Sequence, residues 1–270
     1  MGKIIVNTNK VSTYWKSHMK ESIFRLFMGI LVLATLAGCA STKYSDPKDP
    51  YEGFNRSLYK FNKGVDRAVL KPLAKGYVAV TPKPVQKGVS NFFGNLNDIV
   101  TTVNDVLQAK GKQAGSDGLR FVVNSTFGLA GLFDVASIWG LEKHDEDFGQ
   151  TFGYWGMGSG SYLMLPFFGP STTRDAPGIV GEHFLNPFTY ANDANIRYGS
   201  LGIHLVEKRA SFLEFESQLK EAIDEYTFIK NAYLQNREYK VYDGHPPQDD
   251  TWLLDEDCEA LDACDDVEVK

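Results

Sequence analysis

The sequence predicts an all-α fold for residues 51–240, and three observations support this prediction. Long stretches carry apolar residues at spacings of three and four, which is the period of a helix that buries one face. None of the 270 residues belongs to a run that alternates apolar and polar positions as several strands of a sheet would. No segment is repeated along the chain, so we expect one helical body rather than a repeat array.

The first predicted helix begins near residue 51, because Pro50 suits the first turn of a helix and Asp49 can cap it. Its apolar face carries Phe54, Leu58, Phe61 and Val65. The prolines within 81–84 end this region, and a second helix is predicted from there to Gln108. Its apolar positions are Val85, Val89, Phe92, Leu96, Ile99, Val103 and Val106 or Leu107. Residues 111–115, with a glycine at each end, are predicted to form a loop.

Residues 119–136 are apolar on nearly every side, which is typical of a helix in a large core or in lipid. The stretch also contains Arg120 and Asn124, so it is a poor candidate for a helix that crosses a membrane. We expect a helix that lies partly in a membrane, with its polar side against protein or water. The clearest helix is predicted over 203–237. Its apolar stripe consists of Phe212, Phe215, Leu219, Ala222, Tyr226, Ile229 and Tyr233.

The first 38 residues have the features of a secretory signal. Lys16, Lys20 and Arg25 precede an apolar run over 26–37, which is too short to span a bilayer. The run closes with Leu-Ala-Gly-Cys at 36–39, which resembles the bacterial lipobox and predicts a lipid on Cys39. A secretory signal that contains Cys39 by coincidence is the alternative, and translation starts at Met1 or Met19. By resemblance to the sorting rule of Gram-negative lipoproteins, Ala40 favours the outer membrane.

The negative charge of the chain is concentrated at its C-terminus. Removing residues 1–38 takes away five basic and one acidic residue and leaves −10, yet residues 39–242 hold 22 basic and 22 acidic residues. A neutral body argues against nucleic-acid binding, which needs a basic patch. After a polar linker at 39–50 and the body, the acidic tail at 241–270 is predicted to be disordered. Cys258 and Cys264 could form a disulfide in the tail, which could also be an acidic docking arm; the role of both stays open.

The sequence offers little support for catalysis or for a metal, and we expect neither, nor any cofactor. His144, Asp145, Glu146 and Asp147 form a compact group, for which a solvated loop is favoured over a metal site. Glycines 156, 158 and 160 are not followed by the Lys-Ser or Lys-Thr of a phosphate-binding loop. A phospholipase would need a nucleophile in a Gly-x-Ser-x-Gly elbow, which the sequence lacks. His183 and His204 are predicted to serve in packing or capping.

The most informative segment is 149–170, where six glycines lie among aromatic and apolar residues. Because glycine permits tight turns and close approach of the backbone, this segment can fold back as a hairpin. Its apolar side chains suit acyl chains, whereas irregular backbone at membrane depth needs protein or water beside it. The combination predicts a cavity with one apolar and one hydrated side.

Several motifs in this order resemble the VacJ/MlaA family of outer-membrane lipoproteins, from about Asp49 to about Tyr233. They are the Asp-Pro-Tyr-Glu-Gly-Phe-Asn-Arg run at 49–56, the Phe-Asn pair at 61–62, the Gly-Leu-Phe-Asp-Val-Ala run at 131–136, the segment 146–170, and the Arg-Asp pair at 174–175. The resemblance implies a ring of helices in the inner leaflet of the outer membrane, with a central amphipathic channel that a hairpin at about 149–170 helps to gate. The expected channel and hairpin residues are Gly149, Gly153, Tyr154, Trp155, Gly156, Met157, Gly158, Gly160, Tyr162, Leu163, Leu165 and Pro166.

The same resemblance implies a function and partners. Phospholipid misplaced in the outer leaflet would pass through the channel to a periplasmic carrier, part of a pathway with an inner-membrane ATP-driven transporter, and the ring would bind a trimeric porin. The alternative function is a structural lipoprotein that scaffolds porins without moving lipid. We expect Arg120 or Arg174 to contact phosphate headgroups, with a structural ion pair as the competing role. Asn55, Arg56 and Asn62 match the family's N-terminal motif, but helix capping or packing is the role we expect for them.

Overall fold

The computed structural model describes residues 46–247; the predicted signal peptide, Cys39, Cys258 and Cys264 lie outside these residues. Helix α2 (Glu52–Val65) continues through a π-helical turn (Asp66–Leu70) into α3 (Lys71–Val80). Then come α4 (Lys83–Leu107), α5 (Gly111–Thr126), α6 (Val135–Ile138) and α7 (Phe148–Tyr154). Two short strands, β1 (Tyr162–Leu165) and β2 (Gly169–Thr172), precede α8 (Asp175–Leu185). A 3₁₀ turn (Pro187–Tyr190), α9 (Ala194–Ser211), another 3₁₀ turn (Phe212–Phe215), α10 (Glu216–Glu221) and α11 (Glu225–Val241) complete the fold.

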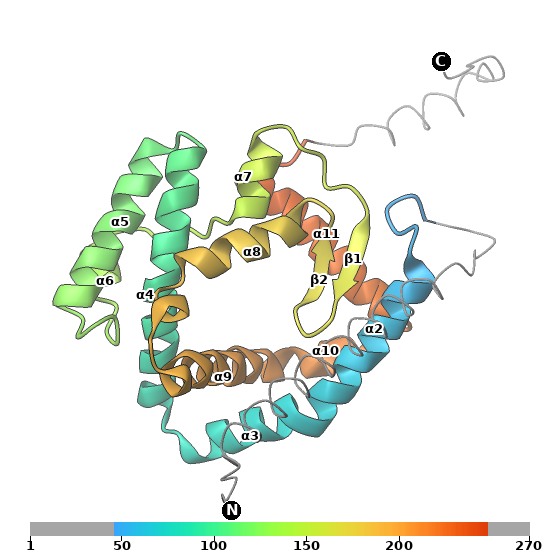
Figure 1. The fold of residues 1–270 in the computed structure, drawn as a ribbon, viewed down its shortest axis with the longest axis horizontal. Helices are drawn as coiled ribbons and strands as arrows, with labels where there is room; N and C mark the ends of the chain where they lie inside the picture. The colour runs from blue at the N-terminus through green and yellow to red at the C-terminus, as the bar shows by residue number, and fades with distance from the viewer. Residues whose placement is uncertain (1–45, 248–270) are drawn as a thin grey trace, which may run out of the picture.

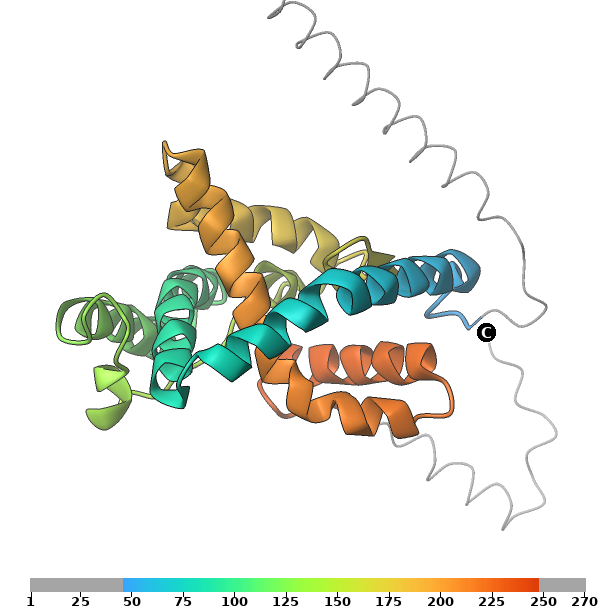
Figure 2. The same cartoon turned by 90° about the horizontal axis from the view of Figure 1, so that it is seen from below.

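The predicted all-α class is confirmed, because the described residues are mostly helical and contain only this one antiparallel pair of strands. In Figure 1, helices α4, α8 and α9 and the β1–β2 pair surround a central region that no ribbon crosses, and α3 lies outside α9. The view from below shows α10 and α11 as a separate layer beneath α2 and α3 (Figure 2). The body is therefore a ring of helices with a second layer on one side.

None of the helices between residues 46 and 247 has the length and apolarity needed to cross a bilayer.

Three predicted boundaries are wrong. Residues 111–115 are helical, because α5 starts at Gly111 and packs along α4. The helix predicted to continue to 136 ends at Thr126, since Leu129, Ala130 and Gly131 all adopt positive φ angles. The helix predicted over 203–237 is split, because the chain turns at 222–224 and Asp224 then caps α11 by accepting a hydrogen bond from the Tyr226 amide.

The start of α2 also differs from the prediction. Its N-cap position is Tyr51, and the Asp49 side chain does not cap the helix. The Asp49 carboxylate is fully buried instead and accepts hydrogen bonds from Asn55 and from the Tyr226 hydroxyl. Residues 46–49, predicted to be part of a linker, thus pack against α2 and α11; Lys230 of α11 lies 2.7 Å from the Asp46 carboxylate.

Candidate functional site

A β-hairpin, which follows α7 and precedes α8 in the chain, lies at the edge of the ring between α8 and α2 (Figure 1). Tyr162 pairs with Thr172 and Leu165 with Gly169, so the hairpin occupies 162–172. The hairpin was predicted to cover about 149–170. It starts later than predicted because residues 148–154 form helix α7. The tip is strained and apolar: Phe167 has a φ of 65°, and Phe167 and Phe168 are 66% and 71% exposed. The hairpin thus offers aromatic side chains at its end.

Two asparagines of α2 complete the outer edge of β1. The buried Asn55 amide donates to the Tyr162 carbonyl (3.0 Å) and accepts from the Met164 amide (2.9 Å). Asn62 repeats this pattern one step along, donating to the Leu165 carbonyl (2.8 Å) and accepting from the Phe167 amide (2.9 Å). Each side chain therefore substitutes for a peptide group of a missing strand. Their predicted role in capping or helix packing is wrong; they hold the hairpin to α2.

The third member of that motif, Arg56, contacts the start of α11 rather than the hairpin. It binds both oxygens of Asp224 and stacks 4.4 Å above the ring of Tyr226. These contacts join α2 to the start of α11, next to a cavity of about 440 Å³ between the two helices.

The predicted channel residues that are most accessible lie at the end of α7 and in the loop that joins α7 to β1. Tyr154, Trp155 and Met157 are each more than half exposed. Gly156 has a φ of 91°, which disfavours any side chain there, whereas Gly158 has open space around it. Among the other predicted residues, Tyr162 is fully buried, while Leu163, Leu165 and Pro166 are half-buried.

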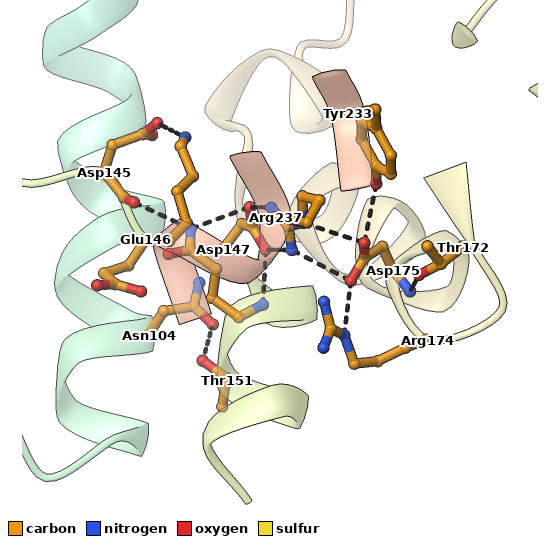
Figure 3. A network of polar contacts seen from close by, with 12 residues as sticks. Asn104, Asp145, Glu146, Asp147, Thr151, Thr172, Arg174, Asp175, Tyr233 and Arg237 are labelled. Carbon is orange, nitrogen blue, oxygen red and sulfur yellow. Dashed lines mark hydrogen bonds and ion pairs between the residues drawn. The ribbon is translucent and has the colours of Figure 1, made fainter. Parts of the chain in front are cut away.

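A network of charges joins α7, α8 and α11 at the base of the hairpin (Figure 3). Arg237 of α11 donates to Asp147, the N-cap of α7, and to Asp175, the first residue of α8. Asp175 also accepts from Arg174 Nε (2.8 Å) and from the Tyr233 hydroxyl (2.8 Å). Burial favours the neutral carboxyls, but the Arg237 guanidinium, together with Gln150 at Asp147 and with Arg174 and Tyr233 at Asp175, outweighs it and lowers the pKa of both carboxyls.

Two glycines allow α7 and α8 to approach each other closely enough for this network to form. A Cβ atom on Gly149 would clash with the Asp175 carboxylate and lie 2.5 Å from Arg237 Nη2. Gly178 of α8 packs against the same turn, where a Cβ would lie 3.0 Å from the Gly149 amide nitrogen. Gly149, which was predicted to belong to the hairpin, lies in α7 instead. There its lack of a side chain allows α7 to contact α8.

Helices α4 and α5 have the opposite of the usual amphipathic arrangement, with polar side chains buried and apolar side chains exposed. Their facing sides bury polar residues: Asp98, Thr101, Asp105, Asp117, Arg120 and Asn124. Their outer sides, the turn after α5 and the end of α6 expose apolar residues: Val106, Leu119, Val122, Phe127, Leu129, Phe133, Ile138 and Trp139. Burial raises the pKa of Asp98 to about 6 and that of Asp105 to about 7. A large exposed apolar surface over a polar interior is suited to contact with lipid or protein rather than with water.

Residues 144–147 lie in a loop, as predicted, but of the four only Asp145 is exposed to solvent. Glu146 is buried and lies 2.9 Å from Lys110, and His144 Nδ1 lies 2.7 Å from Asp117. No group of three or more His, Cys, Asp or Glu residues within 46–247 is arranged to hold a metal ion. These residues connect α4, α5 and α7, and Asp147 belongs to the Arg237 network. His204 packs against the ring of Phe93, with 4.4 Å between ring centres.

Arg120 and Arg174 are both buried, but their partners differ. Arg120 is 1% exposed, and its two terminal nitrogens donate to Asp134, Ser137 and the Leu141 carbonyl. Arg174 is 6% exposed, and its side chain donates only from Nε; within residues 46–247 its terminal Nη nitrogens have no hydrogen-bond partner. The prediction of headgroup contact stays a prediction for both residues.

Sequence reasoning assigned Asp49 to a helix cap and Tyr226 to an apolar stripe, and it assigned no role to Arg237. A signal for Arg237 was present, because it continues the spacing of Tyr226, Ile229 and Tyr233 along the predicted buried stripe. A charged residue on such a stripe indicates a buried ion pair.

The comparisons with known proteins agree with this fold. Residues 47–240 match the family model described as MlaA lipoprotein. The intermembrane phospholipid transport system lipoprotein MlaA of Haemophilus influenzae is 34% identical over 227 residues, which are 81% of this chain and 91% of that protein. The protein of the same name from Escherichia coli K12 is 34% identical, over 80% of this chain and 88% of its own. A solved structure reported as the structural basis for maintenance of bacterial outer membrane lipid asymmetry has a TM-score of 0.64 and 31% identity, and covers 72% of this chain and 98% of its own.

Proposed function

Because this chain belongs to the MlaA lipoprotein family, we propose that it removes misplaced phospholipid from the outer leaflet of the outer membrane and passes it to a periplasmic carrier. Transfer along a path within the ring breaks no covalent bond, so the proposal requires no catalytic residue and no cofactor. A lipid on Cys39 would keep the protein at the inner leaflet, where its periplasmic side can meet the carrier. A trimeric porin would be its partner within the membrane.

The reversed amphipathic character of α4 and α5 supports placement in a leaflet. Exposing Leu119, Val122 and Ile138 to water is unfavourable by about 25 cal/mol for every Å² of apolar surface. Acyl chains remove that cost, while the polar residues between the helices remain shielded from lipid. A helix pair of this kind lies in a leaflet and does not have to span it.

The observation that carries the proposal is the position of Arg174 beside the glycine-containing loop. A Cβ on Gly153 would lie 3.0 Å from Arg174 Nη1, so the guanidinium lies directly against α7, just before that loop. Exposed Tyr154, Trp155 and Met157 follow at once and provide an apolar surface. A cation beside an apolar surface matches a phosphate group and the acyl chains attached to it. Arg174 is favoured over Arg120, whose terminal nitrogens are already occupied.

The scaffold function remains the second candidate, because the same apolar surface of α4 and α5 could bind a porin alone. The two candidates differ in what the loop and hairpin contact. A transporter brings phospholipid to residues 154–163, whereas a scaffold needs only protein there.

Photocrosslinking of the full-length lipoprotein in cells separates these candidates. p-Benzoylphenylalanine is introduced at Tyr154, Met157 or Leu163, and adducts are identified by mass spectrometry. The control position is Gln218, which is exposed on α10. The proposal expects phospholipid adducts at the three test positions and none at Gln218. Porin adducts without phospholipid at any of them would establish the scaffold function instead.

A further inference from the structure

The Asp175 carboxylate at the base of the hairpin has no acceptor site left. Its Oδ1 accepts from Arg174 Nε (2.8 Å) and Arg237 Nη2 (3.1 Å). Its Oδ2 accepts from Arg237 Nε (3.0 Å) and the Tyr233 hydroxyl (2.8 Å). A carboxylate has about four lone-pair sites, and all four are used (Figure 3).

The second carboxylate of the network is occupied in the same way. Asp147 accepts from the Gln150 amide (2.9 Å) and side chain (3.1 Å), and it binds both Nη nitrogens of Arg237. Arg237 thus uses all three guanidinium nitrogens on Asp147 and Asp175. Arg174 is left with one hydrogen bond, although arginine and carboxylate ordinarily pair through two.

We infer that Arg237 is a positioning residue that keeps the terminal nitrogens of Arg174 free for the phosphate of a lipid. By filling the second oxygen of Asp175, Arg237 and Tyr233 prevent Arg174 from forming a two-point pair with that carboxylate. Without Arg237, Asp175 would offer a free oxygen, and Arg174 would rotate onto it. This inference rests on the proposed function, because it assigns a ligand class to the same site.

The test is a double-mutant cycle with p-benzoylphenylalanine at Met157 in the full-length lipoprotein. The variants are Arg174→Gln, Arg237→Gln and the combination of both, with Arg237→Lys added because one ammonium cannot saturate two carboxylates. We expect each single variant to lower the phospholipid adduct about tenfold, the size typical of losing a charge-assisted contact. The double variant should show no further loss, because Arg237 acts through Arg174.

A milder change keeps the test valid if loss of Arg237 prevents folding. Tyr233→Phe frees one lone pair on Asp175 and preserves the packing of the ring, so it should lower the adduct by a smaller factor. Tyr239→Phe on the same helix is the matched control, because Tyr239 is exposed and its hydroxyl has no hydrogen-bond partner among the described residues. A double variant that falls well below both single variants would overturn the inference, as would Arg237→Lys and Tyr233→Phe at the wild-type level. Absence of any adduct in the wild type would instead contradict the proposed function.

Discussion

Replacing Asn55 with leucine tests whether α2 holds the hairpin by substituting for a strand. Asn55 is fully buried and makes three side-chain hydrogen bonds, to Asp49 (2.8 Å), the Tyr162 carbonyl (3.0 Å) and the Met164 amide (2.9 Å). Leucine has a similar volume, so the cavity and packing terms stay small. The loss is therefore almost entirely one of hydrogen bonding.

The expected cost follows from the groups left without partners. The Tyr162 carbonyl and Met164 amide would each become an unsatisfied buried group, at about 1–3 kcal/mol apiece. Asp49 would keep the Tyr226 hydroxyl, so its loss is nearer to about 1 kcal/mol. The sum is roughly 3–7 kcal/mol, a large part of the about 5–15 kcal/mol that stabilises a typical domain.

Guanidinium unfolding of the lipoprotein in detergent, followed by tryptophan fluorescence, measures this cost. Asn97→Ala on α4 is the control, because Asn97 is exposed and makes a single 3.4 Å contact; it should change the free energy of unfolding by about 0.5 kcal/mol or less. Asn62→Leu should lie between them, since Asn62 is half-buried and makes two such bonds. If Asn55→Leu cost no more than Asn97→Ala, the hairpin would not depend on this edge.

Three further changes test other parts of the site. Gly149→Ala should lower the melting temperature, because its Cβ would lie 2.5 Å from a buried guanidinium. The control Gly53→Ala on α2 meets no atom within 4 Å and should leave the melting temperature unchanged. Equal melting temperatures of the two variants would contradict the close junction. Gly156→Val should impair outer-membrane asymmetry, measured as detergent sensitivity, because a side chain disfavours the positive φ of this residue. Gly158→Val, in open space, should impair it less. Normal detergent resistance in both variants would count against a role for this loop. Burial raises the pKa of Asp105 from 3.8 to about 7, so the folded protein holds a proton that the unfolded chain releases, and stability should fall as pH rises from about 4 to above 7. Asp105→Asn should reduce the difference in unfolding free energy between pH 5 and pH 8; an unchanged difference would show that Asp105 does not carry it.

Helical periodicity predicted the elements whose stability comes from one buried face. It located α2 and α4, where apolar residues recur at three and four. It failed for 111–115, where the glycines indicated a loop but packing of α5 along α4 outweighs their low helix propensity. This packing is close, because a Cβ on Gly118 of α5 would lie 3.5 Å from the Thr102 side chain of α4. It also failed at 222–224, because an apolar period can continue across a turn. Asp224, a good N-cap residue, was the local signal for that break.

The site was less predictable, because it depends on partners distant in the sequence. The spacing of seven between Asn55 and Asn62 places both on one face of α2, which the sequence does reveal. That β1 lies in front of this face follows only from contacts across more than 100 residues. Likewise, Arg237 meets Asp147 and Asp175 across 90 and 62 residues. The glycines of 149–170 and the family resemblance predicted a hairpin, whereas its attachments required the structure.

Those attachments also determine where the segment 148–174 has freedom to move. On one side, four hydrogen bonds, two donated by Asn55 and Asn62 and two accepted by them, fix β1 and the start of the turn to α2. On the other side, Arg237 fixes the start of α7, and the Trp155 indole donates to the Leu107 carbonyl at the end of α4 (3.1 Å). Residues 156–160 lie between these two anchors and include three glycines, two of which have positive φ angles. Rotation of the strands as a rigid gate would break the α2 contacts, whereas a change within 156–160 breaks none of them. We therefore expect lipid passage to be accompanied by rearrangement of this loop, with the two strands remaining on α2.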